Sequence, residues 1–211
     1  MPETHLYSLS RLVHAGPWSW QRLLGEIEEG RSYASRYYQP VRDAVVQFSA
    51  TRGRNRDGLV REIRAQIRPE RRWPNRLADN LDAFENFSEN FFPRIARFRR
   101  NFLHQQKDAL LFEGLELNGG PHFEVVDSNG ATRHVFLHAA KWKPNDLAAY
   151  LELLGVIIEA DFGGDSKSMW VMDLKSGKDI KWKSKPALRR RCIGTARLFA
   201  RFLRTMGEPE A

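Results

Sequence analysis

The period of the apolar residues changes near residue 107, and this change restricts the chain to folds that combine helices with strands. Before it, apolar side chains recur every three or four positions, which is the spacing of one helix face. After it, they alternate over short segments bounded by Gly, Asn and Asp, which is typical of half-buried strands joined by turns. The first half predicts helices over 18–29, 31–49, 59–68 and 80–106, with Pro93 as a kink in the last.

The second half predicts three antiparallel strands, because turn sequences separate the apolar segments 110–117, 122–126 and 133–140. A strongly apolar helix over 146–159 follows. The remaining expected elements are a strand over 168–174, a short hairpin partner over 179–183 and a helix from Pro186 to about Met206.

This order predicts an α/β fold, in which a mixed β-sheet is flanked by helices and an N-terminal helical region precedes it. The expected division is a helical, arginine-rich region over 1–79 and an α/β core over 80–211. With 211 residues, the chain is long enough to bury a core.

The net charge of +8 favours a polyanionic partner. DNA is the first expectation, RNA is an alternative, and a protein partner within a larger complex is a third class. The single cysteine, Cys192, excludes a four-cysteine zinc site and a four-cysteine iron–sulfur cluster. No apolar run spans a bilayer and residues 1–10 lack the apolar core of a secretion signal, so the expected location is cytoplasmic, away from membranes.

The most basic stretch, residues 52–76, holds nine arginines against three acids. Arginine has a planar fork that favours bidentate phosphate contacts, so this stretch predicts a nucleic-acid surface. The alternatives are pairing with nearby acids, solubility alone, or docking onto an acidic protein. The candidate contacts are Arg52, Arg54, Arg56, Arg61, Arg64, Arg68, Arg71, Arg72 and Arg76.

A second basic region lies near the C-terminus. Lys181 and Lys183 alternate with Trp182 in a segment that also contains Lys175, Lys178 and Lys185, and cations beside an aromatic ring can contact a backbone and stack a base. The alternative is a solvated face whose tryptophan completes the core. In the last helix, one stripe at helical spacing is formed by Arg190, Arg197, Arg201 and Arg204.

Three local sequences support a resemblance to a known family. Leu9-Ser10-Arg11-Leu12, with Gly16-Pro17 and Trp20 after it, is similar to the opening motif of RecB-like nucleases. The segment 119–126, Gly-Gly-Pro-His-Phe-Glu-Val-Val, resembles their second core strand, and Ala149-Tyr150 resembles the "Q-x-x-x-Y" region. The chain thus resembles the PD-(D/E)XK nuclease superfamily, RecB-like branch, which implies a restriction-endonuclease-like αβββαβ core.

The resemblance also implies where catalytic residues would lie. Active members carry an Asp on the second strand and (Asp/Glu)-x-Lys on the third, which together hold a divalent ion and stabilise developing charge. His122 and His138 occupy these places here, and Lys141 follows one residue later than expected. Because imidazoles supply no negative charge, the resemblance implies a nuclease-like binding protein whose catalytic motif is degenerate.

Other site assignments stay open from the sequence. Asp173-Leu174-Lys175 is a literal D-x-K, and with Asp161 or Asp165 upstream it predicts a Mg²⁺ or Mn²⁺ site of an active deoxyribonuclease; a charged turn has the same sequence. His122 and His138 with Asp127 form another arrangement for activity, although Asp127 also suits a turn. Further alternatives are a zinc, manganese or iron site from His122, Glu124, His134 and His138, and acids on the preceding helix at Glu85 and Glu89.

Overall fold

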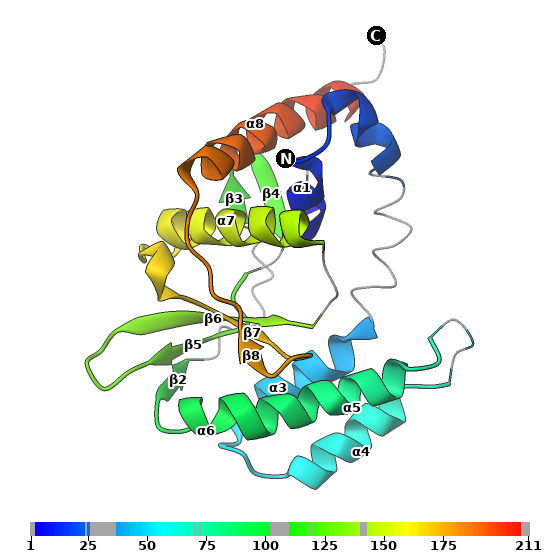
Figure 1. Ribbon diagram of the computed structural model, residues 1–211, viewed down its shortest axis with the longest axis vertical. Helices are drawn as coiled ribbons and strands as arrows, with labels where there is room; N and C mark the ends of the chain where they lie inside the picture. The colour runs from blue at the N-terminus through cyan, green and yellow to red at the C-terminus, as the bar shows by residue number, and fades with distance from the viewer. Residues whose placement is uncertain are drawn as a thin grey trace.

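The computed structural model describes residues 3–23, 25, 37–69, 71, 73–101, 110–118, 120–139 and 143–207. These residues form a mixed α/β fold, which confirms the predicted class. Figure 1 shows a sheet across the middle of the molecule, with one helical layer above it and another below it.

The middle layer is a five-stranded sheet with the order β2-β5-β6-β7-β8. Its pairs are antiparallel except β6 and β7, which are parallel. A parallel pair needs a crossover connection, and helix α7 (Pro144–Asp161) provides it. The strands are β2 (Arg99–Asn101), β5 (Phe123–Val126), β6 (Thr132–His138), β7 (Met169–Asp173) and β8 (Lys178–Asp179).

A second sheet, of order β1-β4-β3, lies in the upper half. Here β1 (Glu3–His5) runs parallel to β4 (Leu115–Asn118), which forms a hairpin with β3 (Leu110–Phe112). The expectation of one strand over 110–117 beside β5 is therefore wrong. Glu113 and Gly114 have φ angles of 51° and 81°, and two such residues reverse the chain in a tight hairpin.

The lower layer consists of α3 (Gln39–Ala50), α4 (Arg56–Gln66) and α5 (Arg76–Asn86), followed by the π-helical turn η2 (Phe87–Phe91) and α6 (Phe92–Ile95). The expected helix over 80–106 is wrong in its length, because it ends at Ile95 and β2 begins at Arg99. Pro93 lacks an N–H and its ring clashes with the preceding turn, which explains the widened turn before it and the early end.

The upper layer packs α1 (Leu6–Leu12) and α8 (Pro186–Gly207) against α7. Two short 3-10 turns accompany them, η1 (Pro17–Ser19) and η3 (Ser166–Ser168). Much of the expected helix over 18–29 and the start of that over 31–49 lie outside the described residues. Within the described ranges no helix is both long and apolar enough to cross a membrane.

The five-stranded sheet separates two hydrophobic cores. Along β6, Val135 and Leu137 lie in the lower core, and Phe136 lies in the upper core. This alternation follows from the period of a strand, whose successive side chains point to opposite faces. The segments 1–79 and 80–211 share both cores, since α1 contributes to the upper core and α3 and α4 to the lower one.

Candidate functional site

His122 lies directly before β5, at the edge of the sheet where β6 ends. Its backbone N–H donates to the carbonyl of Val135 (2.8 Å), and its Nδ1 accepts a hydrogen bond from the backbone N–H of Leu137 (3.2 Å). A ring nitrogen that accepts carries no proton, so the neutral ring has its proton on Nε2. Burial, followed by the charge of Arg42, lowers the pKa of His122 to about 3. His122 is therefore a neutral hydrogen-bond donor at neutral pH.

His138 and Asp173 are register partners at the ends of β6 and β7. The carboxylate of Asp173 accepts hydrogen bonds from its own turn, from the backbone N–H of Lys175 (3.0 Å) and the hydroxyl of Ser176 (2.7 Å). Lys175 Nζ lies 6.0 Å from the ring centroid of Tyr38 in the lower layer. The D-x-K sequence thus forms a hairpin turn, in which the carboxylate holds the turn and the lysine contacts an aromatic ring.

The second acid that a Mg²⁺ or Mn²⁺ site at Asp173 needs, expected at Asp161 or Asp165, is not found beside it among the described side chains. The side chain of Asp165 accepts from the backbone N–H of Lys167 (2.9 Å) and caps η3, and the side chain of Asp161 lies outside the described part of the structure. Across the described residues, no group of three His, Cys, Asp or Glu side chains is arranged to hold a metal ion.

Of the four residues considered for a zinc, manganese or iron site, the structure pairs two, His134 and Glu124. His134 Nδ1 and Glu124 Oε1 lie 3.0 Å apart on neighbouring strands, and His122 is engaged by the backbone of β6. Burial lowers the pKa of His134, although Glu124 acts to raise it. The carboxylate of Asp127 accepts from the backbone N–H groups of Asn129 (2.9 Å) and Ala131 (3.0 Å), so it holds the β5–β6 turn.

The connection from β8 to α8, residues 180–185, runs across the front of the molecule in Figure 1, and we call it the lysine strap. Ile180 and Trp182 pack against the upper core, and Trp182 lies directly over Gly155 of α7. The lysines that alternate with them, Lys181, Lys183 and Lys185, are exposed. An extended chain rises roughly 3.3 Å per residue, so alternate lysines are spaced by about 6.6 Å.

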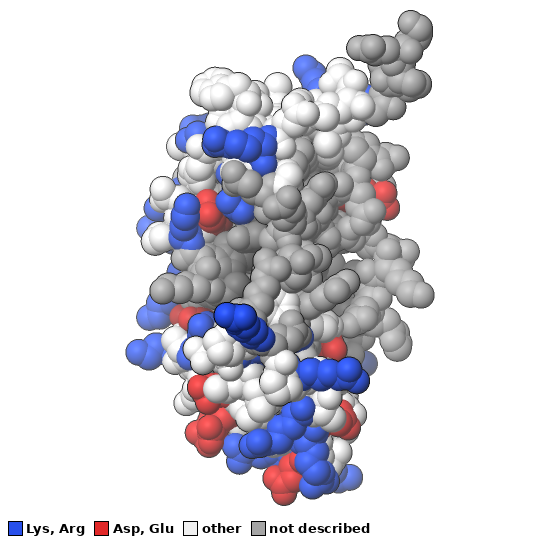
Figure 2. Space-filling model, turned by 90° about the vertical axis from the view of Figure 1, so that its right-hand side faces the viewer, with Lys and Arg blue, Asp and Glu red and all other residues white. Residues whose placement is uncertain are grey.

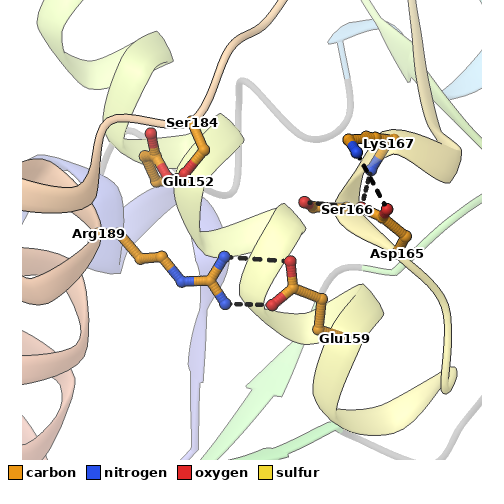
Figure 3. Close-up of polar contacts among 7 residues, drawn as sticks. All are labelled: Glu152, Glu159, Asp165, Ser166, Lys167, Ser184 and Arg189. Atoms are coloured by element: carbon orange, nitrogen blue, oxygen red, sulfur yellow. Dashed lines mark hydrogen bonds and ion pairs between the residues drawn. The ribbon is translucent and has the colours of Figure 1, made fainter.

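A buried carboxylate fastens the end of this strap to α7 (Figure 3). Glu152, which is 1% exposed, accepts hydrogen bonds from the hydroxyl of Ser184 (3.0 Å) and from the backbone N–H of Lys185. A second contact joins α7 to α8. Both terminal nitrogens of Arg189, in α8, donate to the carboxylate of Glu159, in α7, and one of these hydrogen bonds is 3.1 Å long. These contacts fix where α8 begins relative to α7.

The arginine stripe of α8 is exposed, as its spacing predicts. Arg197 is held by Glu113 of the β3–β4 hairpin (2.6 and 3.0 Å), so its charge is partly neutralised. The other members of the stripe, Arg190, Arg201 and Arg204, are exposed and form no ion pair with any residue that the structure describes.

The arginines of 52–76 divide into three groups. Arg56 lies near Glu85 (3.8 Å) and Glu89 (3.7 Å), and Arg76 donates to the carbonyl of Tyr37 and lies over Trp73. Arg72 lies outside the described residues. The rest are exposed without an ion pair to a described residue: Arg52, Arg54, Arg61, Arg64, Arg68 and Arg71. Figure 2 shows many blue side chains at the lower end of the molecule, with red ones among them.

The sequence gives little indication of the surroundings of two charged residues, Glu152 and Arg42. Glu152 stands inside an apolar run, and a charge in such a run is the one pattern that could have marked it as a buried, bonded group. Arg42 lies in α3 among charged and apolar residues like any surface arginine.

No family model, curated protein or solved structure matches this chain.

Proposed function

We propose that this protein binds nucleic acid, DNA first, through exposed arginines on a nuclease-like core that has lost metal-dependent cleavage. The observation that carries the proposal is the group of exposed arginines over 52–71 without carboxylate partners among the described residues. Arginine forks bind phosphate oxygens in pairs, and such a surface lowers the free energy of a bound polyanion by releasing its counterions.

The order of the elements supports the nuclease-like core. The run α5 to α6, β2, β5, β6, α7, β7 follows the αβββαβ order, with the β3–β4 hairpin inserted between the first two strands. In that order β5 and β6 are the second and third strands, as the resemblance to PD-(D/E)XK nucleases requires. The first strand is β2 rather than the segment 110–117.

The chemistry of the catalytic positions favours binding without cleavage. Magnesium prefers oxygen ligands, and the two positions carry His122, held neutral, and His138. The carboxylate of Asp173, the register partner of His138, already accepts two hydrogen bonds from its own turn. This arrangement gives a divalent ion no pair of free carboxylates among these residues.

Binding is tested by the salt dependence of the affinity for short labelled DNA. We expect an affinity that falls roughly a thousandfold between about 50 and about 200 mM salt, as six phosphate contacts would give. Arg61→Gln with Arg64→Gln should reduce the slope of log affinity against log salt by about 2. Fluorescence anisotropy measures this slope, and Arg201→Gln with Arg204→Gln tests the last helix in the same way.

The matched control is Arg97→Gln with Arg133→Gln, which removes the same charge from guanidinium groups that lie over the rings of Phe98 (5.1 Å) and Trp170 (5.7 Å). A slope change as large as that of the α4 variant would show that net charge, and no defined surface, sets the affinity. Absence of binding to DNA and RNA at low salt contradicts the proposal and favours a protein partner. Cleavage in Mg²⁺ or Mn²⁺ that Asp173→Ala abolishes would establish an active nuclease.

A further inference from the structure

The first half of the lysine strap is held by the sheet and by α7. At its start, the backbone N–H of Ile180 donates to the carbonyl of Val171 in β7 (2.9 Å). Two residues later, the ring of Trp182 lies so close to α7 that a Cβ at position 155 would stand 2.7 Å from it, and Gly155 leaves this space open. The ring is therefore seated against the helix.

The end of the strap is held by a buried acid and by the first turn of α8. The carboxylate of Glu152 accepts from the hydroxyl of Ser184 (3.0 Å) and from the backbone N–H of Lys185, as Figure 3 shows for the serine. The carbonyl of Lys185 accepts from the backbone N–H of Arg189 (2.9 Å). With both halves bonded to the fold, the strap has a fixed path.

This fixed path presents a row of ammonium groups. Exposure alternates from residue 180 to residue 185, which is the pattern of an extended segment packed on one face. The exposed members are Lys181, Lys183 and Lys185, and neighbours in this row are about 6.6 Å apart along the chain. The three side chains form no ion pair with any residue that the structure describes.

The acids next to the strap are engaged by other groups. Directly before it, the carboxylate of Asp179 accepts from both terminal nitrogens of Arg94 (3.0 and 2.7 Å). Beyond its end, Arg189 binds Glu159 in the same two-pronged way. Glu152 is buried beneath the strap, where it accepts the bonds described above. The lysine row therefore keeps a positive field.

The aromatic ring of the strap is turned away from this row. Trp182 packs against the upper core and over Gly155, so it is not placed to stack on a base that lies along the lysines. This position favours the alternative in which the tryptophan completes the core. Contacts made by the row are then limited to the charged backbone of a ligand.

We propose that the lysine strap binds three consecutive phosphates of a nucleic-acid single strand without stacking on its bases, and that Glu152 is the positioning residue for this row. The inference rests on the proposed function and names its partner at a second surface. A single strand is flexible enough to follow an extended row of cations, whereas the backbone of a duplex winds away from such a row. Because the row is fixed before binding, little ordering of the strap opposes the contact.

The charge of the row is tested by salt dependence on a single-stranded thymidine oligonucleotide. The strap variant is Lys181→Gln with Lys183→Gln and Lys185→Gln. We expect it to reduce the slope of log affinity against log salt by about 2, since each phosphate contact on a single strand contributes about 0.7. The same reduction is expected on a strand of abasic sites, and a smaller one on duplex DNA. The matched control removes three exposed lysines elsewhere: Lys143→Gln, Lys167→Gln and Lys178→Gln.

The positioning role is tested by two variants that both make the protein one charge more positive. Glu152→Ala releases the end of the strap, so we expect single strands to bind about tenfold more weakly with an unchanged salt slope. Glu159→Ala frees Arg189 and should bind at least as tightly as the wild type. Glu152→Gln keeps one acceptor oxygen and should lose less. Affinities are compared at a temperature where circular dichroism shows every variant folded.

Two results overturn the inference and leave the proposed function standing. One is a strap variant whose slope on single strands equals that of the control, while Arg61→Gln with Arg64→Gln still lowers the slope. The other is equal affinity of Glu152→Ala and Glu159→Ala. A strap variant that loses more slope on duplex DNA than on single strands also contradicts it. A wild type that binds no nucleic acid at low salt overturns the proposed function, and this inference with it.

Discussion

Replacing His122 by Asn should make the protein markedly less sensitive to acid. The pKa of His122 is about 3 in the folded protein and near 6.5 when unfolded, so between these values the unfolded chain binds a proton that the folded chain does not. Acid therefore favours unfolding, at a cost of close to 1.4 kcal/mol for each pH unit below about 6.5. At about pH 4.5 the residue costs about 2–3 kcal/mol of the free energy of unfolding.

Urea unfolding at about pH 7 and about pH 4.5 measures this cost. Asn is the replacement because its Oδ1 can accept the hydrogen bond that Leu137 donates to Nδ1. The difference between the two pH values should shrink by about 2–3 kcal/mol in His122→Asn. His14→Asn, at an exposed histidine, should leave it unchanged. The pKa of His134 is shifted in the same direction, so part of the acid sensitivity should remain. An unaltered difference in His122→Asn would show that His122 titrates normally.

Glu152→Ala should destabilise the fold by about 2–4 kcal/mol, because it leaves the hydroxyl of Ser184 and the backbone N–H of Lys185 without their acceptor in a buried place. Glu152→Gln keeps one acceptor oxygen and should lose less. Glu159→Ala is the control on the same helix: it breaks the partly exposed ion pair with Arg189 and should cost about 1 kcal/mol or less.

The same variant should loosen the lysine strap locally. Trypsin cleaves after lysine only where the backbone can leave its native path, so cleavage after Lys181 and Lys183 should be faster in Glu152→Ala than in Glu159→Ala. Mass spectrometry of brief digests locates the cuts. If both variants lose equal stability and show equal cleavage, the buried carboxylate does not hold the strap.

The helices and strands with strong periodicity could be predicted from the sequence, and the exceptions have local causes. The apolar run of α7, the proline at the start of α8 and the alternation in β6 follow from packing and backbone rules that act within a few residues. The segment 110–117 is also apolar, but the chain reverses within it because Glu113 has a positive φ angle. A positive φ is uncommon for a residue other than glycine, so the sequence does not predict this turn.

The candidate site was harder to predict because it depends on contacts between distant segments. Asp173 and Lys175 match a catalytic pattern in sequence, and only the hydrogen bonds of the turn show that the carboxylate is engaged. Glu152 gives little local signal of its role, because its hydrogen-bond partners, Ser184 and Lys185, are 32 and 33 positions away along the chain. The exposure of the arginines and lysines, by contrast, was predictable. Their helical or alternating spacing places them on the opposite face from the buried apolar residues.

The two cores differ in how much of the chain must exist before each can close. The lower core takes its buried residues from Tyr38 to Leu174, whereas the upper core joins Leu9, near the start, to Ala200, near the end. During synthesis, the lower core can therefore be complete while α8 is still inside the ribosome. Until α8 emerges, α1 and α7 lack the helix that covers them, so during this interval the growing chain exposes apolar residues of the upper core.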